Sequence, residues 1–228
     1  MNKDIPQQIA DQIDDMKPKL RGWIHAATVP IAIALGIVLI MFSRGTAAVT
    51  GAAIFMATSL LLFGVSALYH RIGWSPKARA VFRRIDHANI FLLIAGSYTP
   101  LSLILLPSNK ATILLALVWT GALAGVIFRV FWLGAPRALY VVLYVVLGWS
   151  AMLFVTDLFR ASWITMTLVL IGGLLYSVGA AVYGFKRPNP SPRWFGFHEV
   201  FHSLTVAAFL FQWTGVFIAV VTGARAAS

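Results

Sequence analysis

Two histidines near the end of the chain give the first indication of chemistry. His198 and His202 flank the segment 198–202, which reads H-E-V-F-H and matches the pattern H-E-x-x-H. Residues four apart lie on one face of an α-helix, so both imidazoles can bind the same metal ion. The pattern is also that of zinc metalloproteases. No His, Asp, Glu or Cys follows His202, so a third ligand must come from earlier in the chain.

His70 is the candidate for that third ligand, because every histidine falls at the same end of the predicted helices. The histidines are His25, His70, His87, His198 and His202. Ionisable groups in hydrocarbon are costly, so each requires a partner or a function. A single histidine at a membrane interface is more simply explained by hydrogen bonds to headgroups and loop carbonyls. For His70, His198 and His202 together, with Asp86 nearby, the favoured interpretation is a shared metal ion.

Polar stripes on three predicted helices begin at this same end. Each follows helical spacing, at about 100° per residue, and should face the interior of a bundle rather than lipid. The stripes are Ser59, Ser66 and His70; Asp86, Asn89, Ser97 and Pro100; and His198, His202, Thr205 and Gln212. The sequence therefore predicts a cluster of Ser66, His70, Asp86, His198 and His202, with His25 outside it.

The elements that must position these residues are membrane-spanning helices. The chain has 228 residues, 60% of them hydrophobic and 11% charged, whereas a soluble domain has about 25% charged residues. Its apolar runs reach the roughly 18 residues needed to cross a bilayer core. The predicted spans are 23–42, 47–70, 85–106, 111–131, 137–156, 162–183 and 198–222. This pattern predicts an all-α integral membrane protein, a seven-helix bundle without a separate soluble domain.

The basic residues predict the orientation of the bundle. With the N-terminus in the cytoplasm, 14 of the 18 Lys and Arg residues fall on the cytoplasmic side, as the positive-inside rule requires. The C-terminus is then outside, and the chain is a multi-pass protein of the plasma (inner) membrane. Short basic loops beside membrane spans also account for the net charge of +11. We therefore expect the lipid bilayer as partner and no nucleic acid.

The chain divides into three parts in this scheme. Residues 1–22 form a cytoplasmic tail, 23–222 the membrane domain and 223–228 an external tail. Ile5, Ile9, Ile13 and Met16 have helical spacing, which is consistent with a short amphipathic helix on the membrane surface. A solvated tail is the alternative, because Pro6 and Pro18 limit any helix.

Four segments of the chain resemble those of a known family. They are Ser66-Ala67-Leu68-Tyr69-His70, Asp86-His87-Ala88-Asn89-Ile90, Gly96-Ser97-Tyr98-Thr99-Pro100 and His198-Glu199-Val200-Phe201-His202. In this order, they are similar to the haemolysin III family, within the progestin and adipoQ receptor group that includes the adiponectin receptors. The resemblance implies seven helices, a cytoplasmic N-terminus and zinc bound by His70, His198 and His202. It also implies a functional aspartate at Asp86 and a functional serine at Ser66.

Three histidines with a fourth position open are typical of a catalytic zinc site. Asp86 would then accept a proton from water and pass it to a leaving group, while Ser66 would stabilise an oxyanion or orient Asp86. The resemblance points to hydrolysis of a lipid amide such as a ceramide-like molecule. Glu199 departs from the glutamine of the adiponectin receptors and leaves its helix about 100° from His198, so we do not expect it to be the general base. His87 is expected to have a plain interfacial role.

Other functions compatible with the sequence are a receptor-like or regulatory protein with structural zinc, a pore or transporter, and an intramembrane metalloprotease. The pore is less favoured, because no predicted helix carries a charged stripe from one leaflet to the other. The protease is least favoured, because no acidic ligand follows the H-E-x-x-H segment. Imidazole also suits copper, iron and nickel, so the sequence leaves the metal open, as it does the oligomeric state.

Overall fold

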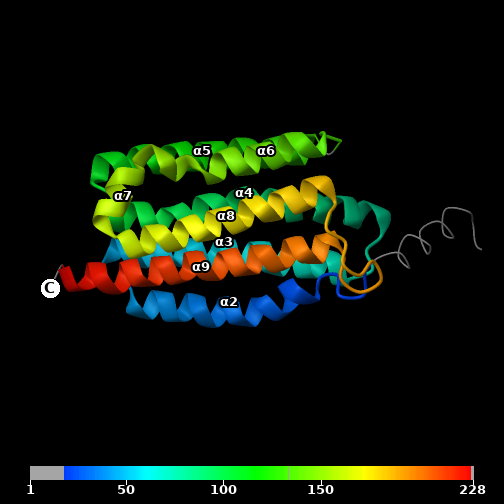
Figure 1. Ribbon diagram of the computed structural model, residues 1–228, viewed down its shortest axis with the longest axis horizontal. Coiled ribbons are helices and arrows are strands. Elements are labelled where there is room, and N and C mark those ends of the chain that lie inside the picture. Colours follow the sequence, from blue (N-terminus) through cyan, green and yellow to red (C-terminus); the bar gives the residue numbers. More distant parts are fainter. Residues whose placement is uncertain (1–17, 133, 227–228) are drawn as a thin grey trace, which may run out of the picture.

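The structure, a computed structural model, describes residues 18–132 and 134–226. Within these residues seven stretches are long and apolar enough to span a membrane, which confirms the predicted all-α, seven-helix membrane fold (Figure 1). The elements are α2 (Trp23–Phe42), α3 (Thr46–Arg71), α4 (Pro76–Leu105), α5 (Ser108–Phe131), α6 (Arg137–Gly148), the 3-10 helix η1 (Ser150–Phe154), α7 (Val155–Ala161), α8 (Trp163–Phe185) and α9 (Phe197–Ala226). The amphipathic helix considered for the tail lies outside the described residues.

Apolar side chains on the outside of the bundle show how the chain meets lipid. Ile37, Met41 and Ile127 are among the large hydrophobic residues that are about half exposed or more. Such a surface would be unfavourable in water, but in a bilayer it contacts the hydrocarbon chains of the lipids. The polar stripes predicted from sequence turn the other way, and Ser59, Ser66, Asn89 and His202 are all buried. The chain is therefore a multi-pass membrane protein.

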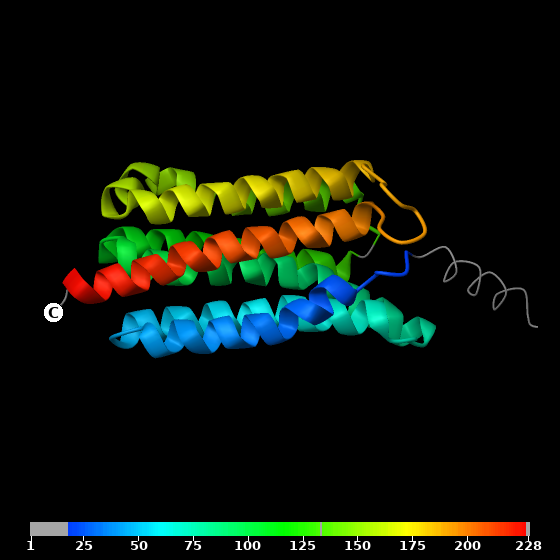
Figure 2. The ribbon, with the colours of Figure 1, turned by 60° about the horizontal axis from the view of Figure 1, so that its bottom comes forward.

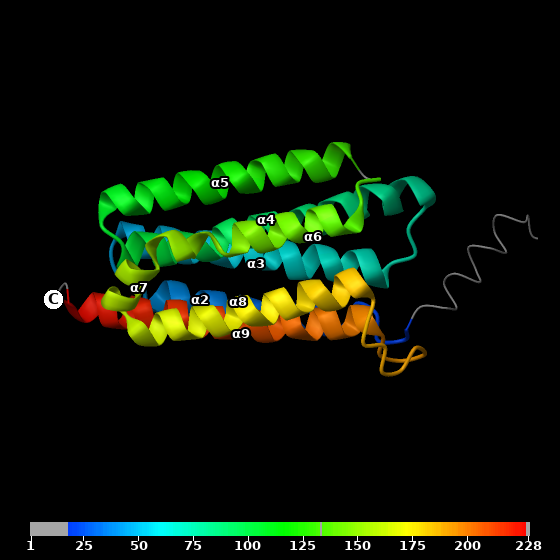
Figure 3. The same cartoon turned by 45° about the horizontal axis from the view of Figure 1, so that its top comes forward.

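Helix α4 lies at the centre of the bundle and has the largest buried share of the seven spans. On one side it packs closely against α3, because small residues let the two backbones approach. A Cβ added at Gly96 would lie 2.0 Å from Thr58 Oγ1, and one at Gly51 would lie 2.7 Å from the Pro100 Cα. Figure 2 shows α2 beside α3, while α5 lies at the edge of the bundle in Figure 3.

Helix α4 also begins nine residues earlier than predicted, at Pro76 rather than residue 85. Proline at the first helical position and Ser75 as N-cap, whose hydroxyl accepts a hydrogen bond from Ala78 N at 3.4 Å, start the helix before its apolar part. The basic residues between them and residue 85 were expected to form a loop. The predicted boundary was wrong because hydrophobicity marks where the lipid begins, whereas the helix continues beyond it.

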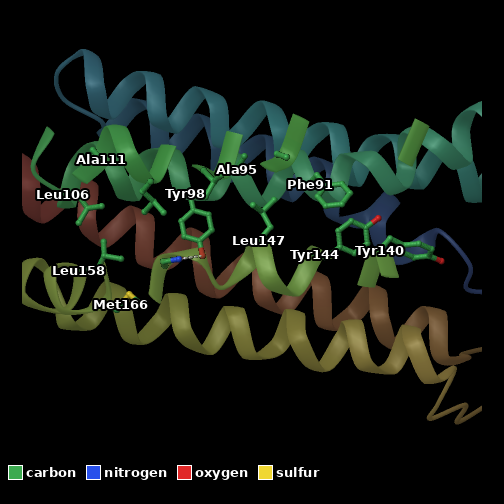
Figure 4. Packing of buried hydrophobic residues seen from close by; sticks show 14 of the residues in the cluster. Phe91, Ala95, Tyr98, Leu106, Ala111, Tyr140, Tyr144, Leu147, Leu158 and Met166 are labelled. Atoms are coloured by element: carbon green, nitrogen blue, oxygen red, sulfur yellow. Dashed lines mark hydrogen bonds between the residues drawn. The ribbon is translucent and has the colours of Figure 1, made fainter. Parts of the chain in front are cut away.

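The fifth span, predicted as one helix over 137–156, is broken in the middle. Helix α6 ends at Gly148, η1 follows, and α7 continues to Ala161. Backbone groups freed inside a membrane need partners within the protein. The Tyr98 hydroxyl provides two of them: it donates to Gly148 O at 2.5 Å and accepts from Ala151 N at 3.2 Å. Tyr98, one of the buried hydrophobic residues in Figure 4, therefore fixes the break.

The two ends of the bundle differ in charge. The end that carries segments 72–75 and 186–196, here called the basic end, also holds the start of α2, α4, α6 and α9. The C-terminal end of α9 lies at the opposite end, as an odd number of spans requires (Figure 1). That the basic end faces the cytoplasm follows from the positive-inside rule and stays a prediction.

Candidate metal centre

The last turn of α3 and the first turns of α9 bring three histidines together at the basic end. His70 Nε2 and His198 Nε2 are 3.2 Å apart, and the possible ligand atoms of His70, His198 and His202 all lie within 4.8 Å of one another. Two nitrogens bound to zinc at 2.0–2.1 Å in tetrahedral geometry are about 3.4 Å apart. The three residues converge as predicted, and together they could hold a metal ion.

Helical geometry accounts for the position of each histidine. His198 and His202 lie one turn apart on α9, with ring centroids 4.5 Å apart. His70 ends α3 and meets both of them from the facing helix, at ring distances of 4.8 Å from His198 and 5.3 Å from His202. The site is therefore formed by two helices, α3 and α9. Helix α3 ends at the depth at which α9 begins.

His25 also belongs to this cluster, and the expectation that it lies outside was wrong. Its ring stacks on that of His202, with centroids 3.8 Å apart and planes 9° from parallel, and it packs edge-on against Phe63. Only 3% of His25 is exposed. The first helix turns this face inward, and its start reaches α9 directly. Sequence position at the predicted membrane surface gave no indication of that inward orientation.

Ser66 and Asp86 lie beside the histidines and line the same cavity. Ser66 is one turn from His70 on α3, and its side chain interacts with the Asp86 carboxyl group on α4. The Asp86 side chain is 12% exposed, and one of its oxygens is 3.6 Å from His87 Nδ1. Both residues thus meet at the wall of the cavity, as their polar stripes predict, and neither belongs to the three-histidine group.

His87 lines the same cavity but does not belong to the three-histidine group, and its ring hydrogen-bonds other residues. Its Nδ1 is 2.8 Å from Arg83 O, and its Nε2 is 3.1 Å from the Tyr183 hydroxyl. The two hydrogen bonds fix the ring between α4 and α8. His87 therefore links two helices, which is a more specific role than the interfacial one expected from sequence.

A buried arginine supplies positive charge near Asp86. Arg129, at the end of α5, is only 3% exposed, and its guanidinium lies 4.4 Å from the centre of the Tyr140 ring. It also interacts electrostatically with Asp86. The sequence suggested only a basic loop flank here. A single arginine in the last turn of a span carries no signal that distinguishes a buried side chain from one at the lipid surface.

Glu199 is the other functional residue that sequence reasoning undervalued. It is fully buried, and its carboxylate accepts hydrogen bonds from Arg21 Nε and, at 2.8 Å, from Gly196 N. In the second contact the Glu199 side chain accepts from the backbone N–H of the residue that precedes α9, as in a capping box. Both carboxylate oxygens are therefore engaged on the face of α9 away from the cavity.

Arg21 belongs to a short segment, residues 18–22, which we call the N-terminal strap. Lys19 N donates to Arg193 O at 3.0 Å, and Leu20 N donates to Trp194 O at 3.3 Å. Gly22, at φ +80°, ends the strap against α3, and a Cβ there would lie 2.7 Å from the Cβ of His70. Only glycine suits both that backbone conformation and that space. The strap thus contacts the residues on either side of the candidate metal centre.

A cavity of about 110 Å³ extends from the histidines into the bundle between α4, α6, α8 and α9. Near the basic end it is lined by Ser66, Asp86, His198 and His202. Farther in, its wall is largely aliphatic and aromatic, for example Ile90, Leu93 and Ile94 on α4. A largely apolar cavity with its ionisable groups at one end suits a molecule with a hydrocarbon chain and a polar head.

The fold and this site together define a seven-helix membrane protein with a candidate three-histidine metal centre at its basic end. The family described as Haemolysin-III related matches residues 14–213, and the chain belongs to that family. It is 35% identical to Hemolysin-3 of Bacillus cereus over 167 residues, which cover 72% of the chain and 76% of that protein. It is 34% identical to the Hemolysin-3 homolog of Bacillus subtilis (strain 168) over 167 residues, or 72% and 78% of the two chains.

Proposed function

We propose that this protein is a zinc-dependent hydrolase that cleaves an amide bond of a membrane lipid, such as a ceramide-like molecule. The observation that supports it best is the spacing of His70, His198 and His202 beside a carboxylate and a hydroxyl that are not needed as ligands. A purely structural zinc site is closed by four protein ligands, whereas a catalytic site keeps one position open.

The residues around the site have complementary roles in such a reaction. Zinc, when bound, would polarise the substrate carbonyl and lower the pKa of water toward about 7. Asp86 accepts a proton from the attacking water and delivers it to the leaving amine, so the C–N bond breaks to give a carboxylic acid and an amine. Ser66 interacts with Asp86 and can orient it, and it can also donate to the carbonyl oxygen as charge develops there.

The substrate class rests on two different grounds. The apolar cavity between helices supports a lipid as the substrate, because its wall is largely apolar and suits a hydrocarbon chain. The amide bond rests on the resemblance to the adiponectin receptor group. A water-soluble peptide or nucleotide would find few polar partners along this wall.

A receptor-like protein with structural zinc is the second candidate, and one observation favours it. The three histidines join the end of α3 to the start of α9, so a metal ion here would fasten two spans together. Both functions predict zinc binding. They differ in whether Asp86 and Ser66 are needed for turnover, which makes these two residues the ones to test.

The names of the Bacillus relatives raise pore formation, and the H-E-x-x-H segment raises proteolysis. Among the described residues that line the cavity, the carboxylate and imidazole groups are confined to the basic end, so no charged path crosses the bundle. In a protease Glu199 would be the general base. Its carboxylate is instead occupied by Arg21 and Gly196 N. Both functions are therefore less well supported than hydrolysis of a lipid.

The proposal is tested by measuring zinc content and lipid-amide turnover on the same purified protein. Wild type should contain stoichiometric zinc and hydrolyse a ceramide-like lipid. Asp86→Asn should retain zinc and lose turnover by about 10²- to 10⁴-fold, the usual contribution of a general acid–base residue. Asp157→Asn, which changes a carboxylate at the opposite end that is paired with Lys110, is the matched control and should be fully active. Zinc without turnover of any lipid amide would favour the structural site.

A further inference from the structure

The cavity has a second set of polar residues, far from the metal centre. Asp86 and Tyr98 both line it from α4, and the 12 residues between them correspond to about 18 Å along the helix. Ile90, Leu93 and Ile94 separate the two. We call the inner region the deep end. Its polar lining residues include Ser97, Tyr98, Trp149, Tyr176, Ser177 and Gln212.

Most polar groups of the deep end are paired within the protein. Tyr98 binds the backbone at the break in the fifth span, as described above. The Trp149 indole donates to the Ser177 hydroxyl at 3.0 Å, and Ser177 donates to Gly173 O at 2.8 Å. Ser97 donates to Ile94 O at 2.9 Å. These groups hold the helices together and do not call for a ligand.

Gln212 is different. It is 91% buried, lines the cavity, and its Oε1 is buried without a hydrogen-bond partner among the described residues. Buried amide groups are almost always hydrogen-bonded, because an unpaired one in apolar surroundings is costly. A glutamine held in this way inside a membrane therefore indicates a partner that enters the cavity.

The neighbouring helix leaves room for this side chain. Gly172 on α8 is buried opposite Gln212, and a Cβ at that position would lie 2.9 Å from Gln212 Cγ and 3.1 Å from Ala208 O. The glutamine thus lies flat against a glycine, which limits the conformations it can adopt. Its amide is therefore held at the cavity wall, inside the membrane span.

We propose that Gln212 recognises a hydroxyl group carried partway along the hydrocarbon chain of a lipid bound in the cavity. This rests on the proposed function in one respect, namely that the polar end of the lipid lies at the metal centre. His202 and Gln212 are ten residues apart on α9, or about 15 Å along its axis. A mid-chain hydroxyl on an extended acyl chain reaches that depth, and it can both donate to and accept from the amide.

The inference is tested by ligand binding, without any measurement of hydrolysis. Stearate and a mid-chain hydroxystearate are titrated into the full-length protein in nanodiscs, with binding followed through tryptophan fluorescence, since Trp149 lines the cavity. Wild type should bind the hydroxylated chain roughly 3- to 10-fold more tightly, as expected for one additional buried hydrogen bond. Equal affinity for the two acids would overturn the proposal and would mean that Gln212 holds only water.

Two variants separate recognition from folding. Gln212→Leu removes the amide at similar size, and it should bind stearate at least as well as wild type and lose the preference for hydroxystearate. Thr214→Val is the matched control, since Thr214 is exposed on the same helix. Its hydroxyl donates a hydrogen bond to the backbone carbonyl of Leu210, one turn earlier in α9. It should keep the preference. A preference that survives in Gln212→Leu would also overturn the proposal. Because no turnover is measured, failure of the hydrolase proposal leaves this result unaffected.

Discussion

The two faces of the first turns of α9 have opposite surroundings. On one face His198 and His202 meet His70 at the wall of a cavity. On the other face Glu199 is closed in by the N-terminal strap through Arg21 and by Gly196. One five-residue motif therefore supplies candidate metal ligands on one face and an anchor on the other. The comparison shows that in H-E-x-x-H the glutamate can fix the helix rather than act on the substrate.

We call the side of α9 with His198 and His202 the metal face and the side with Glu199 the strap face. The largest effect is expected on the metal face. His202→Ala removes one of three ligands and leaves the remaining buried polar groups without their cation, so bound zinc should fall to background and the thermal stability of the purified protein should drop. Metal analysis and thermal unfolding with and without added zinc measure both. If the variant retains stoichiometric zinc, the three-histidine site is wrong.

The strap face is tested by a double-mutant cycle on Arg21 and Glu199. Breaking a buried ion pair from one side leaves a charge without its partner, and because Arg21 is partly exposed we expect about 2 kcal/mol for Glu199→Gln. The double variant with Arg21→Gln should recover part of this loss. Unfolding free energies of the four proteins give the coupling.

The control for that cycle is the ion pair Lys110–Asp157, which joins the start of α5 to α7 at the opposite end at 2.7 Å. Both of its side chains are about one-third exposed, so its removal should change stability by no more than about 1 kcal/mol. Equal losses at the two ends would mean that the strap contributes no more than an ordinary surface pair.

A smaller effect is expected at His25, which stacks on His202. His25→Phe keeps a flat ring against His202, whereas His25→Ala removes the stacking partner. Residues that orient a metal ligand typically contribute about 10- to 100-fold in metal affinity. The alanine variant should therefore bind zinc more weakly by about tenfold and the phenylalanine variant nearly as well as wild type, as measured by competition with a zinc chelator.

The metal face could be predicted from sequence, and the strap face could not. Helical spacing places His198 and His202 on one side, and hydrophobicity places His70 and Asp86 at the same depth, so the cluster follows from two periodic signals. Arg21 and Glu199 are 178 residues apart and share no such signal. Their pairing depends on how the N-terminal strap packs against the start of α9, and the periodicity of the sequence does not predict that contact.

The same reasoning explains the errors in the helices. Four of the nine residues 76–84 are basic, so hydropathy assigned the segment to a loop, although Ser75 and Pro76 start a helix there. The break after Gly148 lies in a uniformly apolar stretch and depends on Tyr98 from another helix. His25 was misplaced because its position at the membrane surface says nothing about which neighbour it faces.

The most direct test of the account is X-ray absorption at the zinc edge on the purified protein. We predict three imidazole nitrogens at about 2.0–2.1 Å and a fourth ligand that is not an imidazole, as in an open site. Four imidazoles would place His25 on the metal and make the centre a closed, structural one. The absence of imidazole scattering would contradict the metal centre itself.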